Sequence, residues 1–214
     1  LLMPCYFMLV FLSKIQIMNY SLYAESTPNP EVMKFVSNRM IADKNVELLS
    51  AESAKNITIA RELFNFPFVK SVFLSSNFIS ITKTENIKWE NIAMQLRIFI
   101  LDFLNKSETV INYTENIDQT TISTSSNNKS VVKKAFEGDA KEIEQILEEY
   151  IKPAVESDGG SITLDSFENG IVTVNLSGAC SGCPSSTITL KQGIESLLKQ
   201  KLGDKVQEVI ANDA

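Results

Sequence analysis

The sequence predicts an α+β protein made of two small α+β domains that a flexible Ser/Thr/Asn-rich linker joins. Residues 19–105 alternate strand-like runs with turns and end in a helical pattern. Residues 106–130 then contain five Ser, five Thr and four Asn without hydrophobic periodicity, which is typical of a linker. A second set of helical and strand patterns begins at Asp139. At 214 residues the chain is long enough for two small domains.

The first predicted domain spans residues 19–105 and consists of strands followed by one long amphipathic helix. Its helix is the clearest element, because Trp89, Ile92, Leu96 and Ile100 recur at helical spacing. The other expected elements are strands in SLYAES and EVMKFVS on either side of the turn TPNP, a polar helical stretch that ends at Pro67, and a hairpin over VKSVFLSSNFISITK with its turn at Ser75–Asn77.

We place the linker at residues 106–138 and the second domain at 139–214, with the order helix, strand, strand, helix, strand. The first helix begins at Asp139, which stands at capping-box spacing from Glu142, and Pro153 bends or ends it. Two glycines at 159 and 160 are expected to need positive φ. The remaining elements are strands SITLDSF and GIVTVNLSG around the hairpin signal Asn169-Gly170, a helix after the cysteines that Gly203 stops, and a last strand in DKVQEVIAND.

Residues 1–18 are interpreted separately as a non-native or leader-like apolar extension. The apolar run of residues 1–12 is too short to span a bilayer, and it lacks the basic start of a secretory signal. The first methionine followed by patterned sequence is Met18. We therefore expect residues 1–17 to be an upstream extension of the reading frame, and Cys5 to be irrelevant to function.

Composition excludes several classes of partner. The formal net charge is −6, so no basic surface favours nucleic acid or an anionic membrane. Three cysteines, Cys5, Cys180 and Cys183, are too few for a disulfide framework. This usage predicts a reducing compartment, and we expect a cytoplasmic protein.

Cys180 and Cys183 form a CxxC motif within GACSGCPSS, between a predicted strand and a predicted helix. Pro184 is a favoured first helical residue, so the motif lies at a helix N-terminus. Unpaired amides and the helix dipole favour thiolate there, and both pKa values should therefore lie below that of free cysteine. Thiolates bind metals, whereas no catalytic residues are evident. Cys180 and Cys183 are thus the candidate metal and cofactor ligands.

One copy of the motif provides only half of a usual metal site. Tetrahedral zinc and iron–sulfur clusters take four ligands, mostly thiolates, and the chain has no histidine. A two-fold dimer that places two CxxC loops face to face would complete the set. A structural zinc shared by two chains and a thioredoxin-like dithiol–disulfide oxidoreductase remain alternatives, and inert structural cysteines are a third.

From Tyr20 to its end, the chain resembles the Nfu-type, NifU-like iron–sulfur cluster carriers. The resemblance rests on IKPAVESDGG and GACSGCPSSTITLKQGIE in the second domain, and on ESTPNPEVMKF, VKSVFLSSNFISITK and the tryptophan-bearing helix in the first, which is similar to the family's N-terminal module. It implies that Cys180 and Cys183 bind a [4Fe-4S] cluster, or in some states a [2Fe-2S] cluster, across a homodimer.

The resemblance also implies partners and a role. They are a second copy of the chain, an upstream cluster scaffold as donor and apo iron–sulfur proteins as acceptors, and the protein would be a carrier rather than an enzyme. The N-terminal module would be a docking domain. Phe64, Phe66 and Phe68 are read as core rather than as a partner patch, and Lys191 as a surface lysine rather than as a counter-charge for the cluster.

Overall fold

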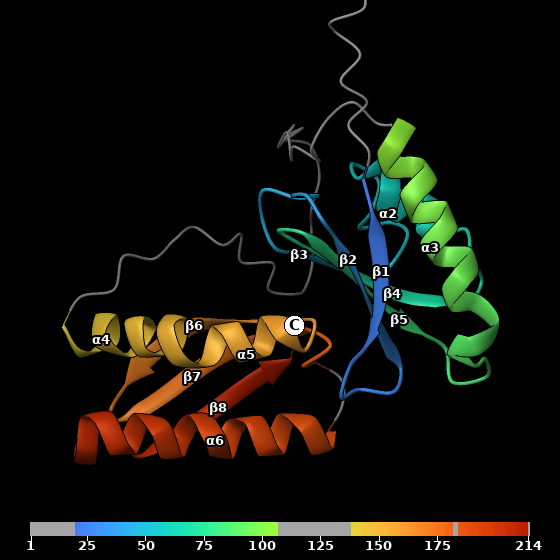
Figure 1. Ribbon diagram of the computed structural model, residues 1–214. Helices are drawn as coiled ribbons and strands as arrows, with labels where there is room; N and C mark the ends of the chain where they lie inside the picture. The colour runs from blue at the N-terminus through green and yellow to red at the C-terminus, as the bar shows by residue number, and fades with distance from the viewer. Residues whose placement is uncertain (1–19, 107–137, 182–183, 214) are drawn as a thin grey trace, which may run out of the picture.

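The computed structural model describes residues 20–106, 138–181 and 184–213, and it confirms the predicted fold class (Figure 1). Each domain combines helices with one β-sheet, and the predicted linker lies between the two domains in the sequence. Residues 107–137, which make up most of that linker, lie outside the described part, as do residues 1–19.

The N-terminal domain is a five-stranded antiparallel sheet with helices on one face. The spatial order is β1-β2-β5-β4-β3. The strands are β1 (Leu22–Ser26), β2 (Val32–Ser37), β3 (Val46–Leu48), β4 (Val69–Ser75) and β5 (Phe78–Lys83). The expected hairpin of β4 and β5 is confirmed, with Ser75 paired to Phe78 across the turn.

Helices α2 (Thr58–Leu63) and α3 (Trp89–Lys106) cover one face of this sheet (Figure 1). The helical spacing of apolar residues buries Leu96 and Ile100 of α3 completely, in one core with Ile79 and Ile81 of β5. Phe64, Phe66 and Phe68 pack partly buried against the same core, as expected, and are not a free patch.

The stretch before Pro67 differs from the prediction. The polar helical stretch expected there is limited to α2, and residues 46–48 form the edge strand β3. The pairing of β3 with β4 explains this, because backbone hydrogen bonds to a distant strand satisfy groups that a local helix would otherwise satisfy. A single-sequence pattern contains no signal of that pairing.

The C-terminal domain has the predicted order of helix, strand, strand, helix, strand. Its helices are α4 (Asp139–Ile146), the π-helical turn η2 (Leu147–Ile151), α5 (Lys152–Ser157), α6 (Pro184–Leu202) and the 3-10 turn η3 (Gly203–Lys205). Its strands are β6 (Gly160–Glu168), β7 (Ile171–Gly178) and β8 (Glu208–Asp213). β7 lies in the middle, antiparallel to β6 and parallel to β8.

Buried and partly buried residues alternate along β7, as expected when helices pack on one face of the sheet. Val172, Val174 and Leu176 are completely buried and share a core with Ile143 of α4 and Ile194 of α6. The predicted hairpin turn is present as well, since Asn169 and Gly170 have φ of 52° and 80°.

The first helix of this domain corrects two predictions. Asp139 is not an N-cap, because Gly138 occupies that position and no side chain caps the helix; instead Asp139 Oδ1 accepts a 2.8 Å hydrogen bond from Lys205 Nζ. Helical spacing in the sequence predicts Tyr150 on the same face as Ile143 and Ile146, but Tyr150 is 46% exposed. The π-helical turn η2 shifts the helical phase just before Pro153, which lies in the first turn of α5.

Candidate functional site

The CxxC motif lies at the junction of β7 and α6, where the sequence predicted it. β7 ends at Gly178, Cys180 follows in a turn, and α6 begins at Pro184. Cys180 is only 8% exposed and packs against the C-terminal core. Cys183 and Cys5 lie outside the described residues.

The cysteine loop is closed against the turn that precedes β6. The backbone N–H of Ala179 donates to the carbonyl of Gly159 (3.1 Å), and both the N–H and the hydroxyl of Ser181 donate to the carbonyl of Gly178 (3.2 and 2.9 Å). Gly178 has φ of 68°, a conformation that favours glycine. We call residues 178–181 the cysteine loop and residues 157–161 the glycine turn.

Gly160 differs from the prediction in an informative way. Only Gly159 of the pair has positive φ (84°), so backbone conformation does not explain Gly160. A Cβ at Gly160 would instead lie 2.7 Å from Cys180 Sγ and 2.7 Å from the carbonyl oxygen of Ser177. Glycine is required there because the sulfur occupies the space of a side chain.

The N-terminal domain contacts both loops directly. Glu47 Oε1 of β3 accepts a hydrogen bond of 3.2 Å from the N–H of Gly178, and it lies 3.2 Å from Ser181 Oγ, where it shares the hydroxyl proton with the carbonyl of Gly178. Asn29 Nδ2, in the turn before β2, donates to the carbonyl of Ala179 (3.4 Å). The cysteine loop therefore has hydrogen-bond partners in a domain more than one hundred residues away in the sequence.

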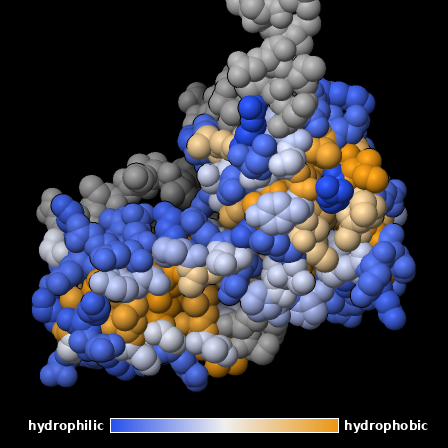
Figure 2. All heavy atoms as spheres, viewed as in Figure 1, coloured by the Kyte–Doolittle hydropathy of each residue, from blue (hydrophilic) through white to orange (hydrophobic). Residues whose placement is uncertain are grey.

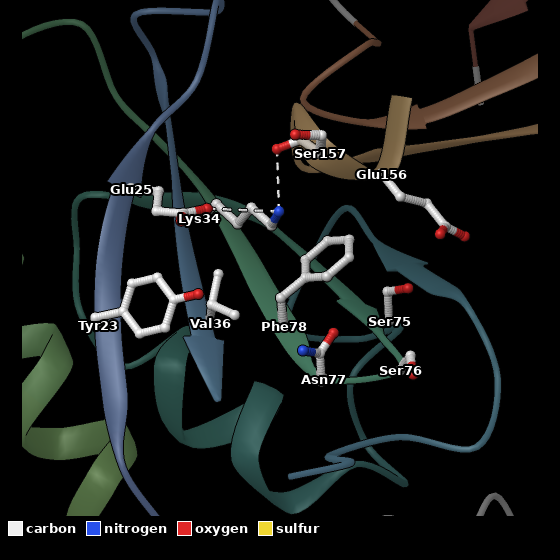
Figure 3. Close-up of a pocket in the computed structure, with 10 residues that line it drawn as sticks. All are labelled: Tyr23, Glu25, Lys34, Val36, Ser75, Ser76, Asn77, Phe78, Glu156 and Ser157. Atoms are coloured by element: carbon white, nitrogen blue, oxygen red, sulfur yellow. Dashed lines mark hydrogen bonds and ion pairs between the residues drawn. The ribbon is translucent and has the colours of Figure 1, made fainter. Parts of the chain in front are cut away.

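The glycine turn has a matching set of partners. Ser80 Oγ donates to the carbonyl of Gly159 (2.6 Å), and Lys34 Nζ donates to the carbonyl of Ser157 (3.0 Å) at the C-terminus of α5. Figure 3 shows the Lys34 bond beside the ring of Phe78, whose centroid lies 4.7 Å from Nζ. An ammonium is favoured at a helix C-terminus because the helix dipole is negative there.

Burial overturns the expected acidity of Cys180. Desolvation, with a smaller contribution from the negative charge of Asp158, raises the pKa of the Cys180 thiol from 9.0 to about 11. The prediction of a lowered pKa relied on the helix N-terminus alone. It could not include the burial of Cys180 against the C-terminal core.

An apolar cavity of about 590 Å³ adjoins Cys180 between α5 and α6. Its walls include Ile151, Val155, Leu190 and Ile194 from the C-terminal domain and Pro28 from the N-terminal domain. Figure 2 shows apolar surface between these two helical layers. A smaller polar cavity of about 390 Å³ lies at the seam between the domains, around Lys34 (Figure 3).

Lys191, which the sequence analysis weighed as a counter-charge for a cluster, forms a surface ion pair. Its Nζ lies 3.3 Å from Glu208 Oε1, which agrees with its interpretation as a surface lysine. Across residues 20–106, 138–181 and 184–213, no group of three or more His, Cys, Asp and Glu side chains is placed to hold a metal ion. No helix in that same part of the chain has the length and apolar character needed to cross a membrane.

Comparison with family models matches both domains. Residues 22–107 match the family described as scaffold protein Nfu/NifU N terminal, and residues 143–210 match the NifU-like domain family. The chain therefore belongs to the two-domain Nfu and NifU-like proteins, and the resemblance seen in the sequence is confirmed.

Curated relatives carry matching names. The NFU1 iron-sulfur cluster scaffold homolog, mitochondrial, of Drosophila willistoni is 32% identical over 177 residues, which are 82% of this chain and 58% of that protein. The human protein of the same name is 31% identical, over 82% of this chain and 65% of its own length. NifU-like protein 4, mitochondrial, of Arabidopsis thaliana is 30% identical, over 81% and 60%.

The chain spans about six tenths of the length of these relatives. Among solved structures, the solution NMR structure of a NifU-like protein from Saccharomyces cerevisiae matches with a TM-score of 0.40 and 22% identity, over 44% of this chain and 86% of that one.

Proposed function

We propose that this chain is an iron–sulfur cluster carrier, which binds a [4Fe-4S] cluster through Cys180 and Cys183 and passes it to apo-proteins. The observation that carries the proposal is the position of Cys180 between β7 and the start of α6, in a domain of the NifU-like family. Relatives named as iron-sulfur cluster scaffold homologs support the same class of cargo. A [2Fe-2S] cluster is the second state that two pairs of thiolates could hold.

Two chains are needed under this proposal. Cys180 and Cys183 supply two thiolates, and a cubane cluster takes four. An isologous contact between two cysteine loops supplies the other two, and the small residues Gly178, Ala179 and Ser181 favour close approach. The partner in the loaded state is therefore a second copy of this chain.

Transfer would proceed by ligand exchange. A donor scaffold delivers the cluster, and thiolates of an acceptor protein then replace Cys180 and Cys183 one after another. The carrier ends with free thiols and forms no covalent bond to a substrate. We accordingly propose a binding and transfer protein rather than an enzyme.

The alternatives use the same residues differently. A dithiol oxidoreductase requires an accessible thiolate nucleophile, whereas Cys180 is 8% exposed and its pKa is raised to about 11. A zinc ion shared by two chains would take the same four sulfurs, and elemental analysis separates it from a cluster.

We also propose the domain limits derived from the sequence, with modules at 19–105 and 139–214 and a linker between them. Thiolate ligation requires a reducing compartment. The expected cytoplasmic location meets this requirement. The relatives are named as mitochondrial proteins, and imaging of the tagged chain distinguishes the two compartments.

The test is anaerobic reconstitution of the full chain with iron and sulfide. We expect a brown protein with a broad visible absorption band and equal amounts of iron and sulfide. Cys180→Ser and Cys183→Ser should each abolish the band, and Cys5→Ser, the same substitution outside the motif, should leave it unchanged. Zinc retained in place of iron would favour the structural site, and a colourless protein that reduces disulfides would contradict carriage.

A further inference from the structure

The second face of the N-terminal sheet is buried although it carries polar and charged side chains. Successive side chains of a strand point to opposite faces of the sheet. Phe35 and Ile79 point into the core beneath the helices, so Lys34 and Ser80 lie on the other face, which the helices do not cover. Both are nevertheless nearly inaccessible, with Lys34 8% and Ser80 2% exposed. A sheet face of this composition normally faces water, so something specific covers it.

The covering element is the pair of loops that holds Cys180. Lys34 and Ser80 donate hydrogen bonds to the backbone carbonyls of Ser157 and Gly159 in the glycine turn. Glu47 accepts a hydrogen bond from the N–H of Gly178 in the cysteine loop. Asn45 Nδ2 adds a bond to Ser161 Oγ (3.0 Å). Backbone polar groups of both loops are thus satisfied by complementary side chains, which is how a specific interface is recognised.

Close packing supports the same conclusion. A Cβ at Gly159 would lie 2.9 Å from Ser80 Oγ and 3.4 Å from Lys34 Cβ, both in the other domain. A Cβ at Gly178 would lie 2.8 Å from the ring of Phe73, which forms a small apolar cluster with Val36 and Phe78 on this face. The loops approach the sheet as closely as glycine allows.

In this docked arrangement the N-terminal domain covers the side of the cysteine loop that faces the sheet. Cys180 is 8% exposed, Pro28 of the N-terminal domain forms part of the wall of the cavity beside it, and Glu47 occupies the N–H of Gly178. Amide donors at such a loop are the groups that would otherwise face thiolate or sulfide. An acceptor, or a second copy of the chain, would have to displace the N-terminal domain.

We propose that the N-terminal domain is a lid over the cysteine loop, and that the docked state and a cluster shared by two copies exclude each other. The lid itself depends only on the contacts above, whereas the exclusion rests on the proposed function. The lid contacts the two loops largely through hydrogen bonds, such as those from Lys34 and Ser80 to the glycine turn. Interfaces of that kind separate readily.

The lid is tested without any cluster, by alkylation of Cys180 with iodoacetamide in the metal-free full chain, followed at the level of the Cys180 peptide. Lys34→Glu places a carboxylate against the carbonyl of Ser157 and near Asp158. We expect Cys180 to react about tenfold faster than in the wild type, the factor that corresponds to loss of one charged hydrogen bond. Lys88→Glu makes the same charge change at an exposed position beside α3 and should not alter the rate.

Ser80→Ala covers the case in which Lys34→Glu fails to fold. It removes only the 2.6 Å bond to Gly159 and should accelerate alkylation about threefold, within the range for one neutral hydrogen bond. Circular dichroism of each variant identifies misfolding. Equal alkylation rates in the wild type and in every folded variant of Lys34 and Ser80 would overturn the lid.

Mutual exclusion is tested by acetylation of lysines with an N-hydroxysuccinimide ester, before and after anaerobic loading with iron and sulfide. Lys34 should become several-fold more reactive on loading, whereas exposed Lys88 should not change. Continued protection of Lys34 in a loaded protein would overturn the exclusion. Failure to load at all would contradict the proposed function, and the alkylation result would still decide the lid.

Discussion

Gly160 leaves the space in which the sulfur of Cys180 lies, since a Cβ at this glycine would be 2.7 Å from Sγ. The first strand of the C-terminal hairpin therefore limits where the thiol can be. Because Cys180 is packed in the C-terminal core, the position of its sulfur depends on Gly160, a residue that has no group able to bind a metal.

Gly160→Ala should destabilise the protein by about 1–3 kcal/mol, the range for overpacking a close-packed interior. It should also lower the amount of cluster bound, because Sγ must move to admit the methyl group. Urea denaturation and iron content after reconstitution measure the two effects. Gly193→Ala, on α6 with no atom within 4 Å of the added Cβ, should instead stabilise by about 0.5–1 kcal/mol. Equal behaviour of the two variants would contradict this packing.

Substitutions of Cys180 should separate ligation from packing. Cys180→Ser puts a hydroxyl into a mostly apolar environment and should cost about 1–3 kcal/mol of stability, whereas Cys180→Ala should cost less because no polar group is buried. Both should lose the cluster. Thermal unfolding and visible absorption of the two variants provide the comparison, and cluster retained by a folded Cys180→Ala chain would rule out ligation by this residue.

Acid should weaken the C-terminal domain through Glu195. Hydrogen bonds from Lys199 Nζ (2.6 Å) and from the backbone N–H of Val209 (3.3 Å) hold the pKa of Glu195 below its ordinary value of 4.5. A depressed carboxyl pKa contributes stability above its unfolded-state pKa, and this stability is lost as pH falls through the folded-state pKa. Stability should therefore decline as pH is lowered from about 5.

Glu195→Gln keeps the shape of the side chain and one acceptor oxygen, but it loses the negative charge and the second acceptor and cannot titrate in this range. The variant should be less stable than the wild type at neutral pH, and its stability should fall less steeply on acidification. Urea midpoints at a series of pH values measure both slopes, and Glu85→Gln removes one exposed carboxyl of the other domain for comparison. Parallel curves for the wild type and Glu195→Gln would contradict the assigned hydrogen bonds.

Local patterns predicted most of the elements around the site. The start of α6 at Pro184 and the turn at Asn169-Gly170 follow from the conformations that these residues prefer. The order of the C-terminal domain follows from hydrophobic period and turn signals, which are properties of neighbouring residues.

What the sequence did not reveal depends on contacts between distant residues. Glu47 and Gly178 are 131 positions apart, and no local pattern indicates that one accepts a hydrogen bond from the other. The raised pKa of Cys180 has the same origin, because it results from burial and not from the helix that follows. Polar alternation along a strand usually indicates a sheet face in water, so the pattern does not reveal that Lys34 and Ser80 are buried.

The central claim, a cluster held by two copies of the chain, is tested most directly by native mass spectrometry of the anaerobically loaded full chain. The predicted species contains two chains and one cluster, and it separates into single chains when the cluster is removed by a chelator. A loaded species of one chain, with the thiols of Cys180 and Cys183 still open to alkylation, would contradict the account.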